Sequence, residues 1–170
     1  GTEPLNFDQQ LSLWLDCKPV IDELLKCNLE FNKANLNTLV SKKSITEKQK
    51  KRAIRSAQKL IASLYGMVRD IAKKFNHPEQ DDLIQEGILG CYKALLKYDP
   101  SKSIQLSLLV EKTSKTVKFS TYATPWIKRY IYLALKETLI KHPEKVKEED
   151  YRAVSTLEDY STINIDAPAR

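Results

Sequence analysis

The sequence predicts an all-α fold, a compact helical bundle of about five or six helices. Three observations favour this class. The 170-residue chain has only four glycines and seven prolines, and long stretches are rich in helix-forming Lys, Leu, Ala, Ile and Glu. The alternation of apolar and polar residues that marks a half-buried strand is scarce. A chain of this length can bury one core, so we expect a single domain with small appendages.

Residues 1–45 are expected to form an N-terminal helical extension whose function is unclear. Apolar clusters recur at Leu11–Leu15, at Val20–Leu25 and at Leu36–Val40, which favours one or two short helices. The central part of the chain, residues 46–143, carries the stronger helical patterns.

A long helix is expected to begin at about residue 46. Either Ser44 or Thr46 can serve as its N-cap, and Glu47 lies three residues after Ser44, as in a capping box. Apolar positions continue at helical spacing as far as Phe75, and the Asn-His-Pro sequence at 76–78 should end the helix.

The next helix should start at Asp81 or Asp82, with Gln85 three residues after Asp82, and should stop at Asp99-Pro100-Ser101. Its apolar residues recur at spacings of three and four and predict one buried stripe: Ile84, Ile88, Cys91, Leu95 and Tyr98. In this interpretation Asp82 is either a helix cap or a contact for a partner.

The last strong helix is expected from about Thr124 to Leu139. Its predicted apolar stripe consists of Ile127, Ile131, Ala134 and Leu135. The same spacing predicts that four side chains are exposed, namely Lys128, Arg129, Tyr132 and Lys136. Residues 144–170 are interpreted as a polar tail or a linker.

Charge is separated along the chain. Residues 112–145 hold eight Lys or Arg against two Glu, and residues 42–59 hold eight against Glu47 alone. Residues 79–86 instead carry four acidic side chains and no cation. This separation suggests a basic surface for phosphates and an acidic surface for a basic protein. The 42–59 tract can also be simply a solvated helix face.

Residues 119–131 read Phe-Ser-Thr-Tyr-Ala-Thr-Pro-Trp-Ile-Lys-Arg-Tyr-Ile and combine four aromatic side chains with two adjacent cations. Aromatic faces stack on unpaired bases and Lys or Arg binds phosphate, so the run suits single-stranded nucleic acid. The alternative is an amphipathic helix whose aromatic residues pack into the core. Composition alone leaves both open.

The run 119–131 closely resembles the promoter-melting segment of bacterial sigma-70 family factors. A second match lies upstream: residues 82–90 read Asp-Leu-Ile-Gln-Glu-Gly-Ile-Leu-Gly, and Lys-Tyr-Asp follows at 97–99. This resembles the family's core-polymerase-binding helix. The resemblance covers roughly residues 59–145 and implies an all-helical, region 2 domain of a promoter-specificity subunit, with core RNA polymerase and promoter DNA as partners.

The resemblance also implies roles for individual residues. Asp82, Gln85 and Glu86 would contact the clamp coiled coil of the largest polymerase subunit. The surface that melts the −10 element and stacks on non-template bases would comprise Phe119, Thr121, Tyr122 and Trp126. Contacts to the −10 duplex and its backbone would come from Lys118, Lys128, Arg129, Tyr132, Lys136 and Lys141.

Three features depart from the family pattern. Pro125 replaces the first of a tryptophan pair, which suggests that the helix starts near Thr124. Residues 103–115 are interpreted as an insertion before the melting segment, either a surface loop or a device beside the aromatic residues. No −35-reading motif follows residue 143, so the chain is either a central sigma domain or a divergent, phage-type minimal factor.

Other classes of protein are not favoured. The sequence shows no phosphate-binding glycine loop, nucleophile–base set or metal-ligand spacing, and its three cysteines and two histidines are scattered, so we expect neither an enzyme nor a cofactor. No membrane span or signal peptide is indicated, and the expected location is the cytoplasm of a bacterium or a phage-infected host. Two alternatives remain: a sigma-like decoy that docks on polymerase without opening DNA, and a basic helical DNA-binding protein.

Overall fold

The computed structural model describes residues 4–75, 77, 79–101, 117–141 and 143–145. This part of the chain contains α-helices and one short 3₁₀ helix and no strand, which confirms the all-α class. The elements are α1 (Phe7–Lys26), α2 (Lys33–Ser41), α3 (Glu47–Ala62), α4 (Tyr65–Lys73), α5 (Gln80–Lys97), α7 (Phe119–Lys141) and η1 (Pro143–Lys145). The predicted insertion at 103–115 and the tail from 146 lie outside the described residues.

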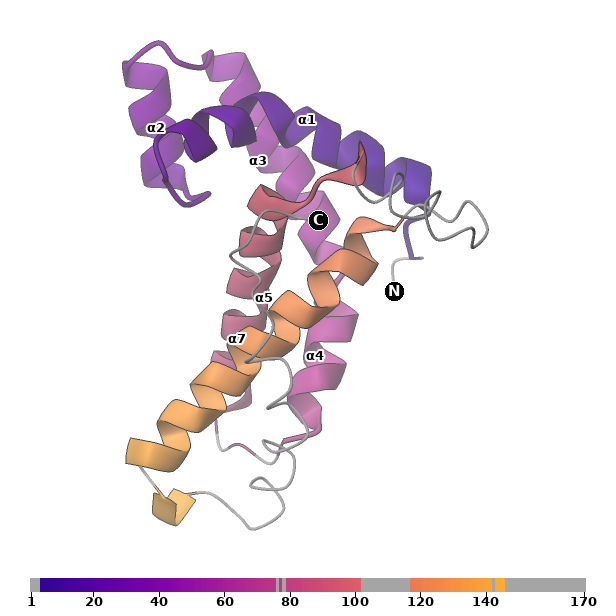
Figure 1. The fold of residues 1–170 in the computed structure, drawn as a ribbon, viewed down its shortest axis with the longest axis vertical. Coiled ribbons are helices and arrows are strands. Elements are labelled where there is room, and N and C mark those ends of the chain that lie inside the picture. Colours follow the sequence, from indigo (N-terminus) through magenta and orange to yellow (C-terminus); the bar gives the residue numbers. More distant parts are fainter. Residues whose placement is uncertain (1–3, 76, 78, 102–116, 142, 146–170) are drawn as a thin grey trace.

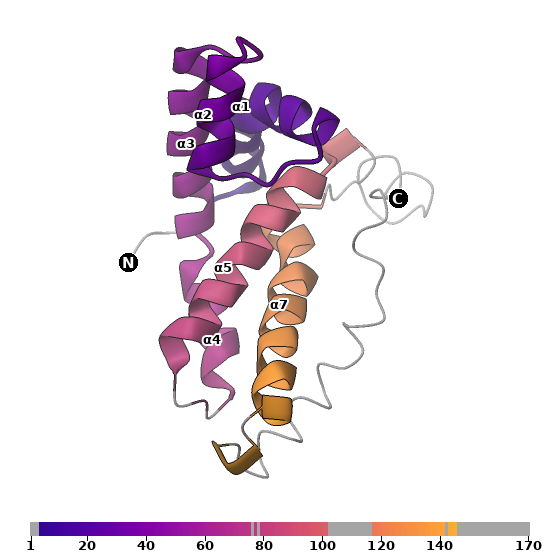
Figure 2. The same cartoon turned by 90° about the vertical axis from the view of Figure 1, so that its left-hand side faces the viewer.

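The helices are arranged in two connected halves. Helix α1 lies across one end of the molecule together with α2 and α3, and α5 and α7 extend side by side away from it (Figure 1). Turning the molecule places α4 alongside α5 and α7 in the second half (Figure 2). One continuous hydrophobic cluster runs through both halves, so the N-terminal helices share the core of the segment that follows.

Helix α1 is held against α3 by a stripe of buried side chains. Asn6 caps α1 in a reciprocal capping box with Gln9, which fixes where the helix begins. Its buried residues recur at helical spacing and include Trp14, Cys17, Val20, Ile21 and Leu24. The small residues Ala53 and Ala57 are fully buried on α3 and allow the two helices to lie close.

The expected single helix over residues 46–75 is wrong, because α3 ends at Ala62 and α4 begins at Tyr65. At the break the Ser63 hydroxyl donates to the carbonyl of Leu60, which satisfies one of the terminal carbonyls of α3. The proposed pairing of Ser44 with Glu47 is also wrong. Thr46 is the N-cap, and its capping-box partner is Gln49, with bonds of 3.0 and 2.8 Å between side chains and backbone.

Helix α5 begins without the aspartate cap that the sequence predicts. Its N-cap is Glu79, which makes no side-chain capping bond, and Asp81 and Asp82 lie inside the first turn. There their negative charges face the positive end of the helix dipole. The end of α5 at Lys97 agrees with the prediction, and its predicted stripe is buried except for Ile88, which is half-buried.

Two glycines of α5 allow neighbouring helices to approach closely, Gly90 facing α7 and Gly87 facing α4. A Cβ atom on Gly90 would lie 2.8 Å from the carbonyl oxygen of Trp126 and 3.2 Å from the Cα of Ile127. A Cβ on Gly87 would lie 2.5 Å from a methyl group of Val68 on α4. Because the atoms that face Gly90 are backbone atoms, they cannot move aside as a side chain can. The contact at Gly90 therefore fixes where the first half of α7 lies on α5.

Candidate nucleic-acid and partner interface

The first turns of α7 are fixed by an aromatic cluster centred on Tyr98. The Tyr98 ring lies 5.5 Å from the rings of Trp14 and Phe119 and 5.4 Å from the ring of Tyr122, measured between centroids. The Tyr122 ring lies 6.4 Å from that of Trp126. The cluster draws on α1, on α7 and on the residue that follows α5, so it joins the chain's N-terminal helix to the aromatic run.

Tyr98 also makes a hydrogen bond that sets the entry to α7. Its hydroxyl donates to the carbonyl of Val117 at 2.6 Å. Burial, assisted by the nearby charge of Asp99, raises the pKa of Tyr98 to about 12. The hydroxyl therefore stays protonated at physiological pH and remains a donor to Val117.

Helix α1 supplies two further contacts to this site. The Gln10 side chain is buried, with an exposed fraction of 4%. Its Nε2 donates to the carbonyl of Leu5 at 2.8 Å, and its Oε1 accepts from the N–H of Ser120 at 2.9 Å. That N–H belongs to the first turn of α7, where helices leave donors without intrahelical partners. The indole of Trp14 donates to the carbonyl of Leu95 on α5 at 3.0 Å.

Replacing Gln10 with leucine should lower the free energy of unfolding by about 1 kcal/mol, because the partly buried N–H of Ser120 loses its acceptor while the side-chain volume is kept. The measurement is urea unfolding followed by circular dichroism. Ser12→Ala on the exposed side of the same helix is the control and should change stability little. An equal, small effect of both substitutions would show that Gln10 does not support α7.

The predicted base-contacting residues differ widely in accessibility. Thr121 is exposed and Tyr122 is half-buried, whereas Phe119 and Trp126 are buried, with exposed fractions of 0% and 1%. The prediction that Trp126 is available to DNA is therefore wrong. Only Thr121 and Tyr122 of this group present surface to a nucleic acid, and Phe119 and Trp126 belong to the core.

The predicted phosphate-contacting residues are mostly at the surface. Lys118, Lys136 and Lys141 are exposed, and Lys128 and Arg129 are half-exposed. Tyr132 is buried, so its predicted exposure is wrong. The reason is that α7 packs against α1 and α4 as well as α5, which buries more of its circumference than one apolar stripe. The ammonium of Lys136 lies 6.0 Å from the centre of the Tyr132 ring.

Pro125 lies within α7, which starts at Phe119 and not near Thr124 as the sequence suggested. A proline here cannot donate to the carbonyl of Thr121, four residues earlier. The Thr124 hydroxyl donates to the preceding carbonyl, that of Ser120, at 2.9 Å. The whole aromatic run is thus helical, and the side chains of residues 119–126 follow helical spacing.

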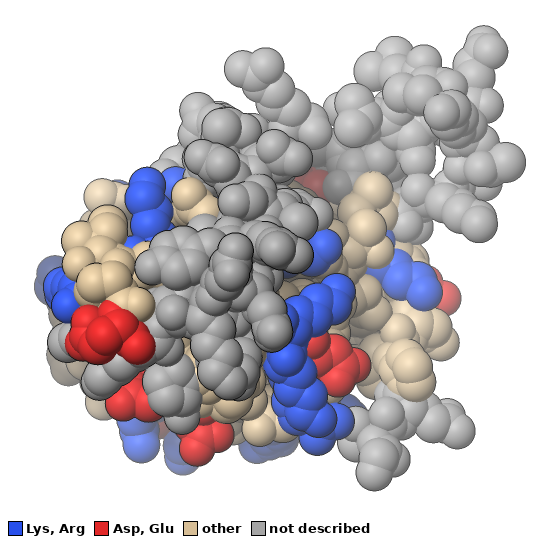
Figure 3. Space-filling view, turned by 90° about the horizontal axis from the view of Figure 1, so that it is seen from below, with Lys and Arg blue, Asp and Glu red and all other residues tan. Residues whose placement is uncertain are grey.

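The acidic segment borders a groove between the start of α5 and the end of α7. The groove has a volume of about 300 Å³. Its lining residues are His77, Glu79, Asp82, Leu83, Gln85, Glu86, Ala134, Glu137, Thr138 and Lys141. The three residues predicted to bind polymerase therefore lie together, with Asp82 and Gln85 exposed and Glu86 half-buried. From this end of the molecule the visible surface shows acidic and basic side chains side by side (Figure 3).

The charges of the groove affect one another. Burial raises the pKa of Glu86, and the carboxylates of Glu137 and Asp82 raise it further. The Lys141 ammonium lies 2.5 Å from a Glu137 oxygen, and this hydrogen bond lowers the pKa of Glu137. His77 joins the two sides of the groove, because its Nδ1 accepts from the N–H of Glu79 and its Nε2 lies 3.2 Å from the Thr138 hydroxyl.

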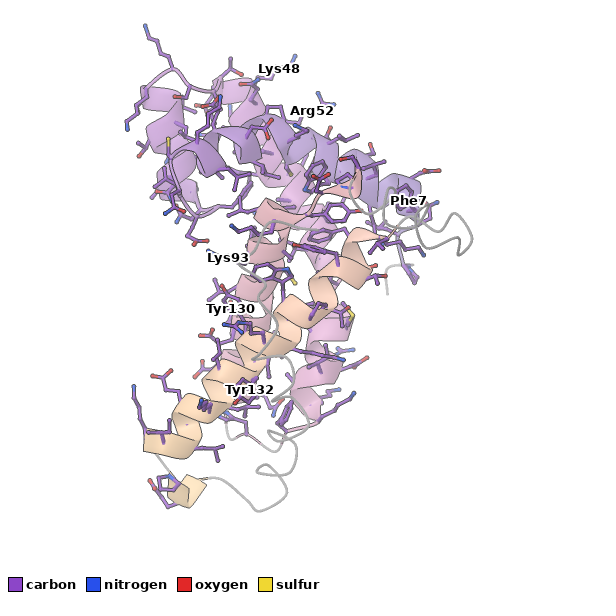
Figure 4. The ribbon with its side chains drawn as sticks, in the orientation of Figure 1. Phe7, Lys48, Arg52, Lys93, Tyr130 and Tyr132 are labelled. Atoms are coloured by element: carbon purple, nitrogen blue, oxygen red, sulfur yellow. The ribbon has the colours of Figure 1, made fainter. Side chains whose placement is uncertain are left out.

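A larger hollow of about 630 Å³ lies on another side of α5. It is lined by Glu30, Phe31, Asn32, Lys33, Ile54, Gln58, Leu89, Tyr92 and Tyr130. The rings of Phe31 and Tyr92 stack at 5.7 Å, and the Lys93 ammonium pairs with Glu30 at 2.6 Å. Tyr130 and Lys93 lie on the same side of the molecule (Figure 4). Sequence reasoning did not predict this hollow, because its walls come from four separated segments.

The described residues hold no cluster of three or more His, Cys, Asp or Glu side chains placed to bind a metal ion. None of the described helices is long and apolar enough to span a bilayer. Burial raises the pKa of the Cys17 and Cys91 thiols to about 12, which keeps both in their unreactive form.

Comparison with known proteins relates the segment that contains α5 and most of α7 to one family. The family described as Sigma-70 region 2 matches residues 60–138. Residues 60–138 therefore form a region 2 of the sigma-70 family. The match spans α4, α5 and nearly all of α7, and it leaves α1, α2 and most of α3 outside.

The curated relatives are cyanobacterial sigma factors. The chain is 37% identical over 93 residues to the RNA polymerase sigma factor SigA2 of Synechococcus elongatus, covering 54% of this chain and 25% of that protein. It is 30% identical over 122 residues to the RNA polymerase sigma-C factor of a Nostoc species, covering 71% and 24%. The chain thus spans about a quarter of the length of these relatives. No solved structure matches significantly.

Proposed function

We propose that this chain binds core RNA polymerase and opens promoter DNA at the −10 element by capturing unpaired non-template bases. The observation that carries the proposal is the placement of Tyr122. Its ring is half-buried against Tyr98 and Trp126, and the exposed Thr121 lies beside it on the same helix. A partly exposed ring that is held by two neighbouring rings is a preorganised platform on which a base can stack.

The energetics favour trapping over active unwinding. Extruding a base from the duplex costs a few kcal/mol, and stacking it on an aromatic ring returns ~1–3 kcal/mol. The balance must come from phosphate contacts, for which Lys118 lies just before α7 and Lys128, Arg129 and Lys136 lie along it. Opening then follows from higher affinity for the separated strand than for the duplex and requires no chemical catalysis.

Residues 46–143 are proposed to carry both activities, with polymerase binding at the acidic groove. Asp82, Gln85 and Glu86 form one wall, and a basic helix of the largest polymerase subunit is the partner that suits their charge. Glu137 adds a fourth polar group from α7. Lys141 lies in this groove, paired with Glu137, so we assign it to this wall and not to DNA.

Glu86→Lys should weaken binding to core polymerase at least about tenfold, because it reverses a partly desolvated charge that faces a basic partner. The affinity is measured by fluorescence anisotropy of the labelled chain against core enzyme. Asp70→Lys makes the same charge change at an exposed position on α4 and serves as the control. Equal effects of the two substitutions would show that the groove is not part of the interface with core polymerase.

The proposed function is tested by transcription from a promoter library with bacterial core enzyme and this chain. We expect transcripts that depend on the chain and share an upstream sequence at the −10 position. If the chain binds core enzyme and only lowers transcription by other sigma factors, it is a decoy and the promoter-opening proposal fails.

A further inference from the structure

A second basic surface lies outside the segment that matches the sigma-70 family. Helix α3 presents five exposed cations, which we call the basic stripe: Lys48, Lys51, Arg52, Arg55 and Lys59. The matched segment begins only at residue 60. Lys48 and Arg52 lie at the end of the molecule where α1, α2 and α3 meet (Figure 4).

The stripe occupies one face of α3. At 100° per residue its five positions fall within an arc of about 100°, and they extend along about 16 Å of the helix. The opposite face carries Ala53, Ala57 and Leu60, which are fully buried against the core. The cations are therefore fixed along a straight, rigid element and not on a loop.

The stripe has little acidic compensation. Glu47 is the one acidic residue in α3, and it pairs with Lys50, which is outside the stripe, at 2.7 Å. Arg52 pairs with Asp16 on α1 at 3.0 Å. Within the described part of the chain, Lys48, Lys51, Arg55 and Lys59 have no ion pair. Concentrating like charges on one face costs stability, which a bound polyanion would offset.

We propose that the basic stripe binds the phosphate backbone of duplex DNA without reading sequence. A DNA duplex carries one negative charge per ~1.7 Å of axis, so about 16 Å of it offers many phosphates to the stripe. Lys and Arg on an exposed helix bind such a backbone by releasing its counterions. The site is distinct from the proposed base-capturing face, since α3 lies in the upper half of the view in Figure 2 and α7 in the lower half.

Two other kinds of partner fit the stripe less well. A helix that lies on a membrane inserts an apolar face, but the apolar face of α3 is buried in the core. A protein interface needs apolar or aromatic anchors and is depleted in lysine. None of the exposed large hydrophobic residues in the described chain lies on α3.

The test measures binding of the full chain, without polymerase, to a fluorescent duplex that has no promoter sequence, over a range of salt concentrations. Neutralising Lys51, Arg55 and Lys59 with glutamine should reduce the slope of log K against log salt by about 2 to 3, since each phosphate contact contributes about 0.9. At low salt the affinity should fall about tenfold or more. Arg55→Gln alone should reduce the slope by about 0.9.

A matched triple variant at α4 and its C-cap, Arg69→Gln with Lys73→Gln and Lys74→Gln, removes the same charge from another exposed surface and should leave the slope nearly unchanged. Equal losses in the two triple variants would overturn the proposal, because net charge alone would explain them. The proposal would also be overturned if the stripe triple variant lost binding to anionic vesicles but bound the DNA duplex as well as the unchanged chain does. Because polymerase is absent, either result leaves the proposed promoter function untouched.

Discussion

Open-complex formation by core polymerase with the Tyr122→Ala variant is expected to fall about ten- to hundredfold, since a base stacked on an aromatic ring contributes ~1–3 kcal/mol. Tyr122 is the aromatic residue of the run that combines partial exposure with packing against two other rings. The measurement is permanganate reactivity of unpaired thymines on a promoter selected from the library. Affinity for core enzyme should not change.

Tyr122→Phe is the matched control, because it keeps the ring and removes only the hydroxyl. It should retain most of the opening activity. Phe119→Ala should behave differently from both, lowering stability by about 3–5 kcal/mol, since Phe119 is fully buried. If Tyr122→Ala destabilised the fold as strongly as Phe119→Ala, Tyr122 would be a core residue and the stacking platform would be ruled out.

Gly90→Ala should destabilise the protein by about 1–3 kcal/mol, the range for overpacking a well-packed contact. The new methyl would lie 2.8 Å from the carbonyl oxygen of Trp126, and backbone on α7 would have to move away from α5. Such a shift would also move Tyr122 and Glu137, which lie on either side of Trp126 in the sequence. We therefore expect a lower midpoint in thermal unfolding and weaker binding of both partners.

Gly66→Ala is the control for this substitution. Gly66 lies near the start of α4, and a Cβ there would meet nothing within 4 Å. Alanine at this position should be neutral or slightly stabilising, because it favours helix over the unfolded chain. A similar loss of stability at both glycines would mean that helix α7 does not lie against Gly90 as described.

Local sequence patterns predicted the helical class and the end of α5 because these depend on residues close in the chain. They did not predict the break at Ser63 and Leu64, where neither glycine nor proline interrupts the pattern. The break depends on a side-chain bond from Ser63 to the last turn of α3 and on the packing of α4 against α5. The cap of α3 shows the same limit. Both Ser44 with Glu47 and Thr46 with Gln49 have the spacing of a capping box, and the structure has the second pair.

The sequence indicated which segments form the candidate site but not how deeply each side chain is buried. Motif resemblance located Tyr122 and Glu86, yet periodicity treated α7 as having one buried side, so Trp126 and Tyr132 were placed on the surface. Burial on several sides follows from contacts with three other helices, which no local pattern records. Gln10 carries no motif at all, and its bond to the first turn of α7 spans 110 residues of sequence.

The most direct test of the account is retention of a single-stranded −10 oligonucleotide of the non-template strand by core polymerase, with and without this chain. We predict that the complex of core enzyme and chain retains the oligonucleotide, that core enzyme alone does not, and that Tyr122→Ala abolishes the difference. Retention by core enzyme that the chain does not improve would contradict the assignment of promoter opening to the first turns of α7.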